Sequence, residues 1–194
     1  MTSLVLTKGD SLPLTKGDNT PLKKVRVNLS WNPNESKSSF AFDLDIIGAV
    51  CKNENLQAVD RSHVAYFGQK NTPAITVSPD NVTGVGEGVD EFFDLDLEKA
   101  AAVGGTHIPV LVAIYGASRK GQNFAMVDGA SVELVDLDTG TVLGSCNITE
   151  QGSSSDESLL VGVFEKQADG SFKYNQTNEF FNKSFEEWVH LLDS

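Results

Sequence analysis

Apolar and polar residues alternate with a period of two along most of the chain, which is typical of strands with one buried and one exposed face. Residues 24–31 and 40–51 show the pattern most clearly, and turn-forming residues follow each of them. Further strands are expected at 63–67, 74–77, 91–97, 108–115, 130–136, 142–148, 159–166 and 172–175. The pattern therefore predicts a chain built mostly of short strands.

Helical signals occur in two places. Asp96 can cap a short helix over residues 97–103, and two glycines follow it. Residues 178–192 carry large apolar side chains at intervals of three or four, which predicts a C-terminal helix with one apolar face. These side chains are Phe181, Phe185, Trp188 and Leu192. We expect this helix to pack on a sheet, and an exposed partner-binding helix is the alternative.

About ten short strands with one or two peripheral helices favour an all-β fold, a β-sandwich, over any α/β arrangement. No regular alternation of strand and helix suggests parallel βαβ units. A length of 194 residues fits a single domain spanning residues 1–194, with the C-terminal helix packed on it.

The charge balance narrows the choice of partners. Fifteen Lys and Arg against twenty-seven Asp and Glu give a net charge of -12, which repels nucleic acid and attracts cations. The chain shows no secretory signal pattern and no apolar run long enough to span a membrane, so we expect a cytoplasmic protein without direct membrane insertion. Cys51 and Cys146 lie far apart in sequence and are expected to be buried thiols.

An acidic, glycine-rich segment at residues 79–91 is the richest candidate site. Glycines let the backbone fold tightly, and the carboxylates supply the hard oxygen ligands that calcium prefers. The acidic residues are Asp80, Glu87, Asp90 and Glu91. Zinc would need His or Cys, a phosphate would be repelled, and the spacing does not match an EF-hand. A solvated acidic connector is the alternative.

Asp43 and Asp45 flank a leucine on a predicted strand, so their carboxylates project from the same face. A cation between them would relieve their repulsion. The same Asp-Leu-Asp triplet recurs at 94–96 and 136–138, where we expect only the polar face of an ordinary strand.

Catalytic patterns are weak. His63, His107 and His190 are isolated in sequence, and no known nucleophile or metalloprotease motif is present, so no enzyme is predicted. Residues 118–124 form a basic turn in an acidic chain. This turn is expected to be a solvated hairpin or a contact point for an acidic partner or a neighbouring loop.

Several segments together resemble the TerD family of tellurium-resistance and stress-response proteins. They are Leu-Thr-Lys-Gly at 6–9 and again at 14–17, the strand that ends at Trp31, Phe-Asp-Leu-Asp at 42–45, the acidic loop at 80–91 and Gly-Gln-Asn-Phe at 121–124. The resemblance implies a β-sandwich that binds calcium through this loop and neighbouring aspartates. It also implies a role in resistance to tellurite, phage and colicins, with partners in a stress complex at a membrane.

The resemblance assigns calcium ligation to a defined set of residues. The positions that match the family in residue type are Asp43, Asp45, Asp80, Asn81, Asp90 and Glu91. Glu87 stands where the family usually has Asp and still offers a carboxylate. Ala41 and Val89 replace further family acids, and Tyr115-Gly116 replaces a usual His-Asp. Fewer charged ligands imply weaker binding, or one site where typical members have two.

The resulting hypothesis is a non-enzymatic, calcium-binding stress-response protein that acts as a scaffold or regulatory component. Its alternative is a protein-interaction β-sandwich with a reduced or lost metal site. A small hydrolase with a metal-assisted site is a third candidate.

Overall fold

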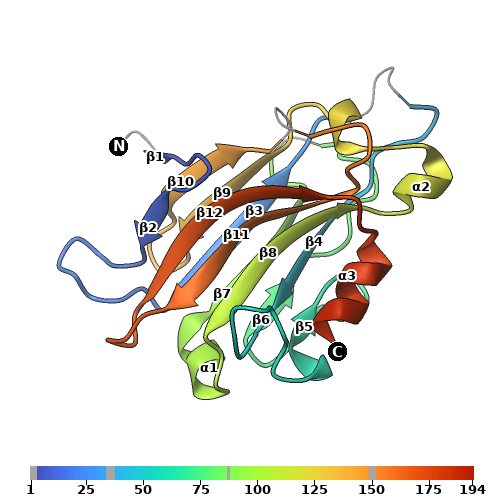
Figure 1. Ribbon diagram of the computed structural model, residues 1–194. Helices are drawn as coiled ribbons and strands as arrows, with labels where there is room; N and C mark the ends of the chain where they lie inside the picture. Colours follow the sequence, from blue (N-terminus) through green and yellow to red (C-terminus); the bar gives the residue numbers. More distant parts are fainter. Residues whose placement is uncertain (1–3, 34–37, 87, 149–151) are drawn as a thin grey trace.

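The computed structural model describes residues 4–33, 38–86, 88–148 and 152–194, which fold into two sheets packed face to face (Figure 1). The first sheet contains β1 (Leu4–Val5), β3 (Lys24–Ser30), β6 (Ile75–Val77), β7 (Glu91–Asp96), β9 (Ser131–Asp136) and β10 (Thr141–Asn147). The second contains β2 (Ser11–Pro13), β4 (Leu44–Ala49), β5 (Val64–Ala65), β8 (His107–Ile114), β11 (Ser158–Lys166) and β12 (Phe172–Phe181). The helices are α1 (Leu97–Ala102), α2 (Ala117–Lys120) and α3 (Phe185–Leu192), with 3-10 turns η1 (Arg61–His63) and η2 (Phe124–Met126).

The strand order is β1-β10-β9-β3-β7-β6 in one sheet and β2-β12-β11-β8-β4-β5 in the other. Neighbouring strands are antiparallel, apart from β1, which runs parallel to β10. The all-β sandwich expected from the sequence is confirmed. Each of the ten expected strand segments contains a strand, and β1 and β2 add two short edge strands, each directly before one of the two Leu-Thr-Lys-Gly repeats.

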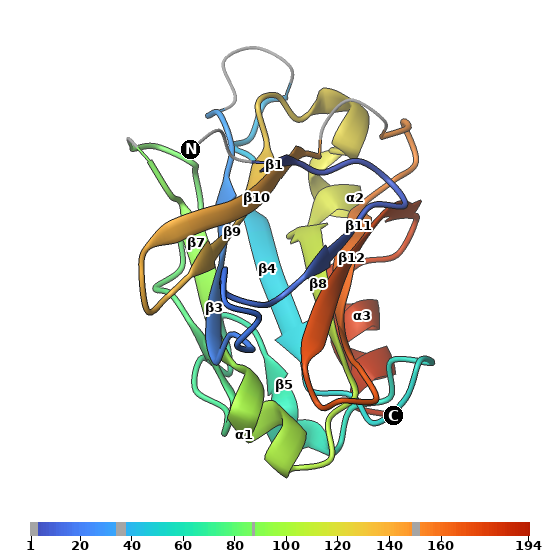
Figure 2. The same ribbon diagram turned by 90° about the vertical axis from the view of Figure 1, so that its left-hand side faces the viewer.

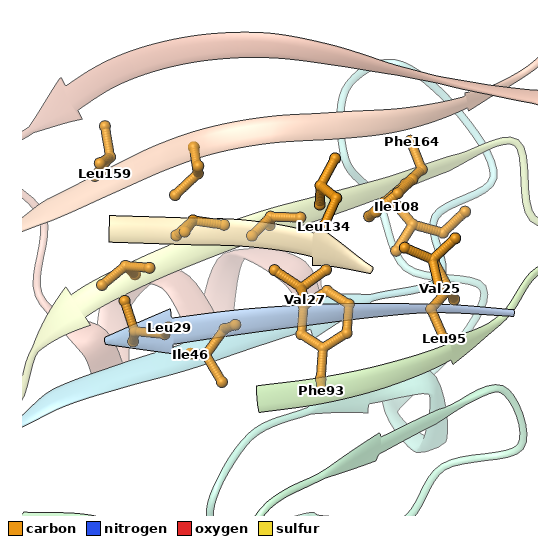
Figure 3. Packing of buried hydrophobic residues seen from close by; sticks show 14 of the residues in the cluster. Val25, Val27, Leu29, Ile46, Phe93, Leu95, Ile108, Leu134, Leu159 and Phe164 are labelled. Atoms are coloured by element: carbon orange, nitrogen blue, oxygen red, sulfur yellow. The ribbon is translucent and has the colours of Figure 1, made fainter. Parts of the chain in front are cut away.

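The main core lies between the two sheets. Alternate residues of β3 point inward, and Val25, Val27 and Leu29 are fully buried. Figure 3 shows these side chains among residues of the facing sheet, including Ile46 and Phe164. Each large side chain buried in this way contributes about 1.5 to 3 kcal/mol to folding, so the period-two pattern supplies most of the driving force for the sandwich.

A second, smaller core lies on the outer face of the β4–β8 sheet, where α3 packs (Figure 1). Ile47 and Leu111 face outward from β4 and β8 and are buried under Phe185 and Trp188. This explains why β4 is buried at every position instead of alternating. The C-terminal helix is therefore packed on a sheet, as expected.

The boundary of that helix differs from the sequence expectation of 178–192. The chain continues as strand β12 to Phe181, paired with β11, and α3 begins only at Phe185. Ser184 and Glu187 form a capping box, in which each side chain accepts a hydrogen bond from the other residue's N–H. Phe181 therefore contacts Trp188 from the strand, edge to face with ring centroids 5.2 Å apart.

Two other local expectations were tested by the structure. Asp96 caps α1 by accepting a hydrogen bond from the Lys99 N–H at 3.0 Å, as expected. The basic turn at 118–124 is not a hairpin, because it forms the short helix α2 between Gly116 and Gly121, which both have positive φ. Among the described residues, no helix has both the length and the apolar character needed to cross a membrane.

Candidate metal centre

Two acidic segments, residues 43–45 and the loop that contains Asp80, meet in the folded chain. Helices α2 and α1 lie at opposite ends of the sandwich (Figure 2). Antiparallel pairing places Leu44 at the start of β4 opposite Ile114 at the end of β8. It likewise places Glu91 at the start of β7 opposite Leu29 near the end of β3. The loop between β6 and β7 therefore returns to the strand ends beside the start of β4.

Three carboxylates converge there. Asp43 precedes β4, Asp45 belongs to β4, and Asp80 lies in the β6–β7 loop, yet one oxygen of each lies within 4.8 Å of the others. Asp45 is only 2% exposed, and its Oδ2 has no hydrogen-bond partner. The structure thus brings together the Asp-Leu-Asp strand and the acidic loop, which are thirty-five residues apart in sequence between Asp45 and Asp80.

Burial raises the pKa of three acidic side chains at this end of the sandwich, those of Asp43, Asp45 and Glu91. Burial, together with the nearby charges of Glu91, Asp43 and Asp80, raises the pKa of Asp45 to about 9. Burial also raises the pKa of Asp43, although the ammonium of Lys120 opposes the shift. The pKa of Glu91 rises to about 8, again because of burial, with two backbone hydrogen bonds acting in the opposite direction. A cation at this point would relieve both the desolvation and the repulsion.

Three of the other predicted ligands hold the loop in place. The Asp90 carboxylate accepts hydrogen bonds from the Trp31 N–H at 2.9 Å and from the Asn81 side-chain amide at 2.9 Å. The Glu91 carboxylate accepts from the Ile46 N–H at 3.0 Å and from the Asn81 N–H at 3.3 Å. These bonds tie the loop to the residue that follows β3 and to β4. Glu87, also predicted as a ligand, lies outside the described residues.

Trp31 connects the loop to the start of β4. Its indole N–H donates to the Phe42 carbonyl at 3.2 Å, so the chain just before Asp43 is fixed. Gly84 packs directly on the same indole with a φ of +65°, and a Cβ at this position would overlap the ring. The Asn81 side-chain oxygen accepts from the N–H groups of Thr83 and Gly84 and so closes the turn.

Lys120 is a site residue that the sequence did not single out. Its ammonium lies 3.7 Å from Asp43 Oδ2, and both side chains are largely buried. Gln122, two residues later, donates from its side-chain amide to the carbonyls of Phe40 and Ala41 at 3.0 and 3.1 Å. The sequence signal for this residue was the basic turn at 118–124 in an otherwise acidic chain. One of the two expectations for that turn was contact with an acidic partner or a neighbouring loop.

The remaining Asp-Leu-Asp triplets have structural roles. Asp94 and Asp96 lie on the more exposed face of β7, as expected, but Asp136 lies on the buried face of β9 and is only 4% exposed, so the expectation of a polar strand face is wrong there. Asp94 forms a two-point ion pair with Arg26 at 2.6 and 2.8 Å, and Asp96 caps α1. Asp136 accepts hydrogen bonds from the turn that follows β9, including the Asp138 N–H at 3.0 Å. Among the described residues, the Asp-Leu-Asp triplet is therefore part of a candidate metal site only at 43–45, where Asp80 supplies a third carboxylate.

The chain matches a known protein family and several known proteins. The family described as "TerD domain" matches residues 2–190. The stress response protein SCP2 of Bacillus subtilis (strain 168) is 26% identical over 159 residues, covering 77% of this chain and 79% of that protein. The tellurium resistance protein TerD of an Alcaligenes species is 29% identical over 155 residues, or 78% of each chain.

Solved structures show the same fold. The crystal structure of a homologue of telluride resistance protein (TerD) from Streptomyces coelicolor A3(2) has a TM-score of 0.67 and 21% identity, and covers 87% of this chain and 95% of that one. The family match extends along nearly the whole chain, from residue 2 to residue 190. The chain therefore belongs to the TerD domain family, whose members include tellurium resistance and stress response proteins.

Proposed function

We propose that this protein binds calcium at the cluster formed by Asp43, Asp45 and Asp80. The observation that carries the proposal is the buried Oδ2 of Asp45, which has no hydrogen-bond partner and lies beside two other carboxylates. A buried polar oxygen without a partner costs folding free energy, and buried carboxylates are normally paired, protonated or bound to a metal. A bound cation would satisfy this oxygen and remove the repulsion.

The donor chemistry supports calcium over other metals. The three residues offer carboxylate oxygens, whereas zinc sites generally include His or Cys. Calcium takes about six to eight oxygens in loose geometry, so water or backbone carbonyls would complete its shell. Asp80 is exposed, which leaves this side of the cluster open to water. Magnesium demands near-octahedral geometry and gives up its water reluctantly, so we expect it to bind less well.

We further propose that the protein acts in a cytoplasmic stress response without catalysing a reaction, as a calcium-dependent scaffold or regulatory component. Support comes from the tellurium resistance and stress response proteins in its family. The three histidines lie in η1, β8 and α3, in elements that supply none of the three carboxylates. Its expected partners are other proteins of a stress complex at a membrane.

Calcium titration tests the proposal directly. An ion that binds only the folded state stabilises it by RT ln(1 + [L]/Kd), about 2.7 kcal/mol at a hundredfold excess over Kd. We expect calcium to raise the melting temperature of the wild-type protein and to give a saturable calorimetric signal, with magnesium doing less. Asp45→Asn should abolish or strongly weaken both effects.

Asp138→Asn is the matched control, because it removes one carboxylate from another Asp-Leu-Asp triplet and its side chain is 40% exposed. It should respond to calcium as the wild type does. A wild-type melting curve and calorimetric trace that do not change at millimolar calcium would contradict the proposal. That result would favour a protein-interaction sandwich whose metal site has been lost.

A further inference from the structure

Lys120 is held beside the carboxylate cluster by two separate features of the fold. The short helix α2 follows β8 directly, and its last residue is Lys120, whose N–H donates to the Gly116 carbonyl at 3.0 Å. Beyond the helix, the Gln122 amide anchors the chain to the carbonyls just before Asp43. The Tyr115 N–H also donates to the Asp43 carbonyl at 2.8 Å. Backbone and side-chain hydrogen bonds before and after Lys120 therefore hold its ammonium beside Asp43.

Lys120 is the cation that pairs with the carboxylate cluster. Its Nζ lies 3.7 Å from Asp43 Oδ2, and among the described residues no other ion pair involves Asp43, Asp45 or Asp80. One ammonium lies beside a cluster of three acidic side chains, and it pairs with Asp43 alone. It also leaves the buried Asp45 Oδ2 without a partner. An ammonium has no fixed coordination geometry, and a lysine stem is flexible enough to leave for water.

We propose that Lys120 is an internal counter-ion that competes with calcium for Asp43, so that calcium must displace its ammonium in order to bind. This inference rests on the proposed calcium site. A calcium ion bound to a carboxylate lies about 2.3 to 2.6 Å from its oxygen, which brings it close to an ammonium bound to the same group. Two cations so close together repel each other strongly in a partly buried site.

The competition has a functional consequence. Because Lys120 ends α2, and the chain from α2 to Gln122 holds the residues before Asp43, calcium binding would release a cationic side chain from this end of the sandwich. Lys120 would then set the calcium concentration to which the protein responds. Its charge also compensates the largely buried carboxylate of Asp43 in the calcium-free protein.

Calorimetric calcium titration of Lys120→Met tests the inference, with Lys99→Met as a matched control. The Nζ of Lys99 lies 3.7 Å from an Asp96 carboxylate oxygen, the same distance as between Lys120 and Asp43. Lys99 belongs to α1, at the opposite end of the molecule from α2 (Figure 2). We expect Lys120→Met to bind calcium at least about tenfold more tightly than the wild type. Lys99→Met should leave the affinity unchanged, and Lys120→Arg, which keeps the charge, should remain close to wild type.

A second measurement needs no calcium. In chelator, loss of the counter-ion should lower the melting temperature of Lys120→Met more than that of Lys99→Met, because Lys120 pairs with a largely buried carboxylate and Lys99 is mostly exposed. A Lys120→Met affinity equal to or weaker than wild type would overturn the competition while leaving calcium binding intact. Absence of calcium binding in both proteins would overturn the calcium proposal and the competition together. A melting temperature in chelator that Lys120→Met leaves unchanged would overturn the counter-ion role.

Discussion

The calcium-free protein should lose stability as the pH rises from mildly acidic to mildly alkaline, and Asp45 should cause much of the loss. Its pKa in the folded protein is about 9, whereas an aspartate in an unfolded chain has a pKa of about 3.9. Between these values the folded protein holds a proton that the unfolded chain has released. The stabilisation is therefore complete below about pH 4 and is lost progressively as the pH rises toward 9.

The size of the effect follows from the linkage relation. One proton held only by the folded state changes the free energy of unfolding by about 1.4 kcal/mol per pH unit. Asp45 alone should therefore remove about 2.7 kcal/mol between about pH 5.5 and pH 7.5. Glu91, whose pKa is about 8, adds to the slope in the same direction. Typical domains are stable by only about 5 to 15 kcal/mol, so the loss is large enough to measure.

Urea unfolding in chelator, followed by tryptophan fluorescence at several pH values, measures this slope. Asp45→Asn should show a slope smaller by about 1.4 kcal/mol per pH unit and should be more stable than the wild type at the alkaline end. Asp138→Asn, which alters an exposed carboxylate, should keep the wild-type slope. Saturating calcium should flatten the wild-type profile, because the ion takes the place of the proton. A stability that is independent of pH in chelator, or an Asp45→Asn slope equal to that of the wild type, would refute the reasoning.

Three further outcomes are expected. Gly84→Ala should destabilise the fold by about 1 to 3 kcal/mol in urea unfolding and weaken calcium binding, because the added Cβ meets the Trp31 indole at a positive φ. Trp188→Ala should cost about 3 to 5 kcal/mol in the same assay, since the ring is only 4% exposed; a loss below about 1 kcal/mol would show that α3 contributes little. Asp45→Asn and Asp80→Asn should each weaken calcium binding, and the double variant should lose less affinity than the sum of the two single losses, because both residues serve one site. Strictly additive losses would instead indicate independent sites.

The sequence alone predicts the strands well, because their pattern is local. In β3, for example, Val25, Val27 and Leu29 alternate with more polar residues, and a period of two has one structural interpretation. The cap of α1 by Asp96 is equally local, since donor and acceptor are three residues apart. The start of α3 could not be predicted from the sequence in the same way. The stretch before Phe185 has a helical pattern of apolar residues, but pairing with β11 keeps it extended.

The candidate site was also predictable only in part from the sequence. The residue types and the Asp-Leu-Asp spacing indicate a cation site, but the same triplet occurs three times in the chain. Only the fold shows that Asp80 joins the first triplet, whereas Asp94 pairs with Arg26. Likewise, the carboxylate of Asp90 has the residue type of a ligand, yet it accepts hydrogen bonds that fix the loop.

The sequence by itself determined which residues can be buried, which can turn, and which carry oxygen ligands, because these are properties of single residues and their near neighbours. The tertiary structure decided which acids meet, which of them are desolvated, and that Lys120 faces Asp43. Those outcomes depend on the pairing of β4 with β8 and of β3 with β7. The electrostatic interactions of the site act between positions that are adjacent in space and far apart in sequence, so no local pattern encodes them.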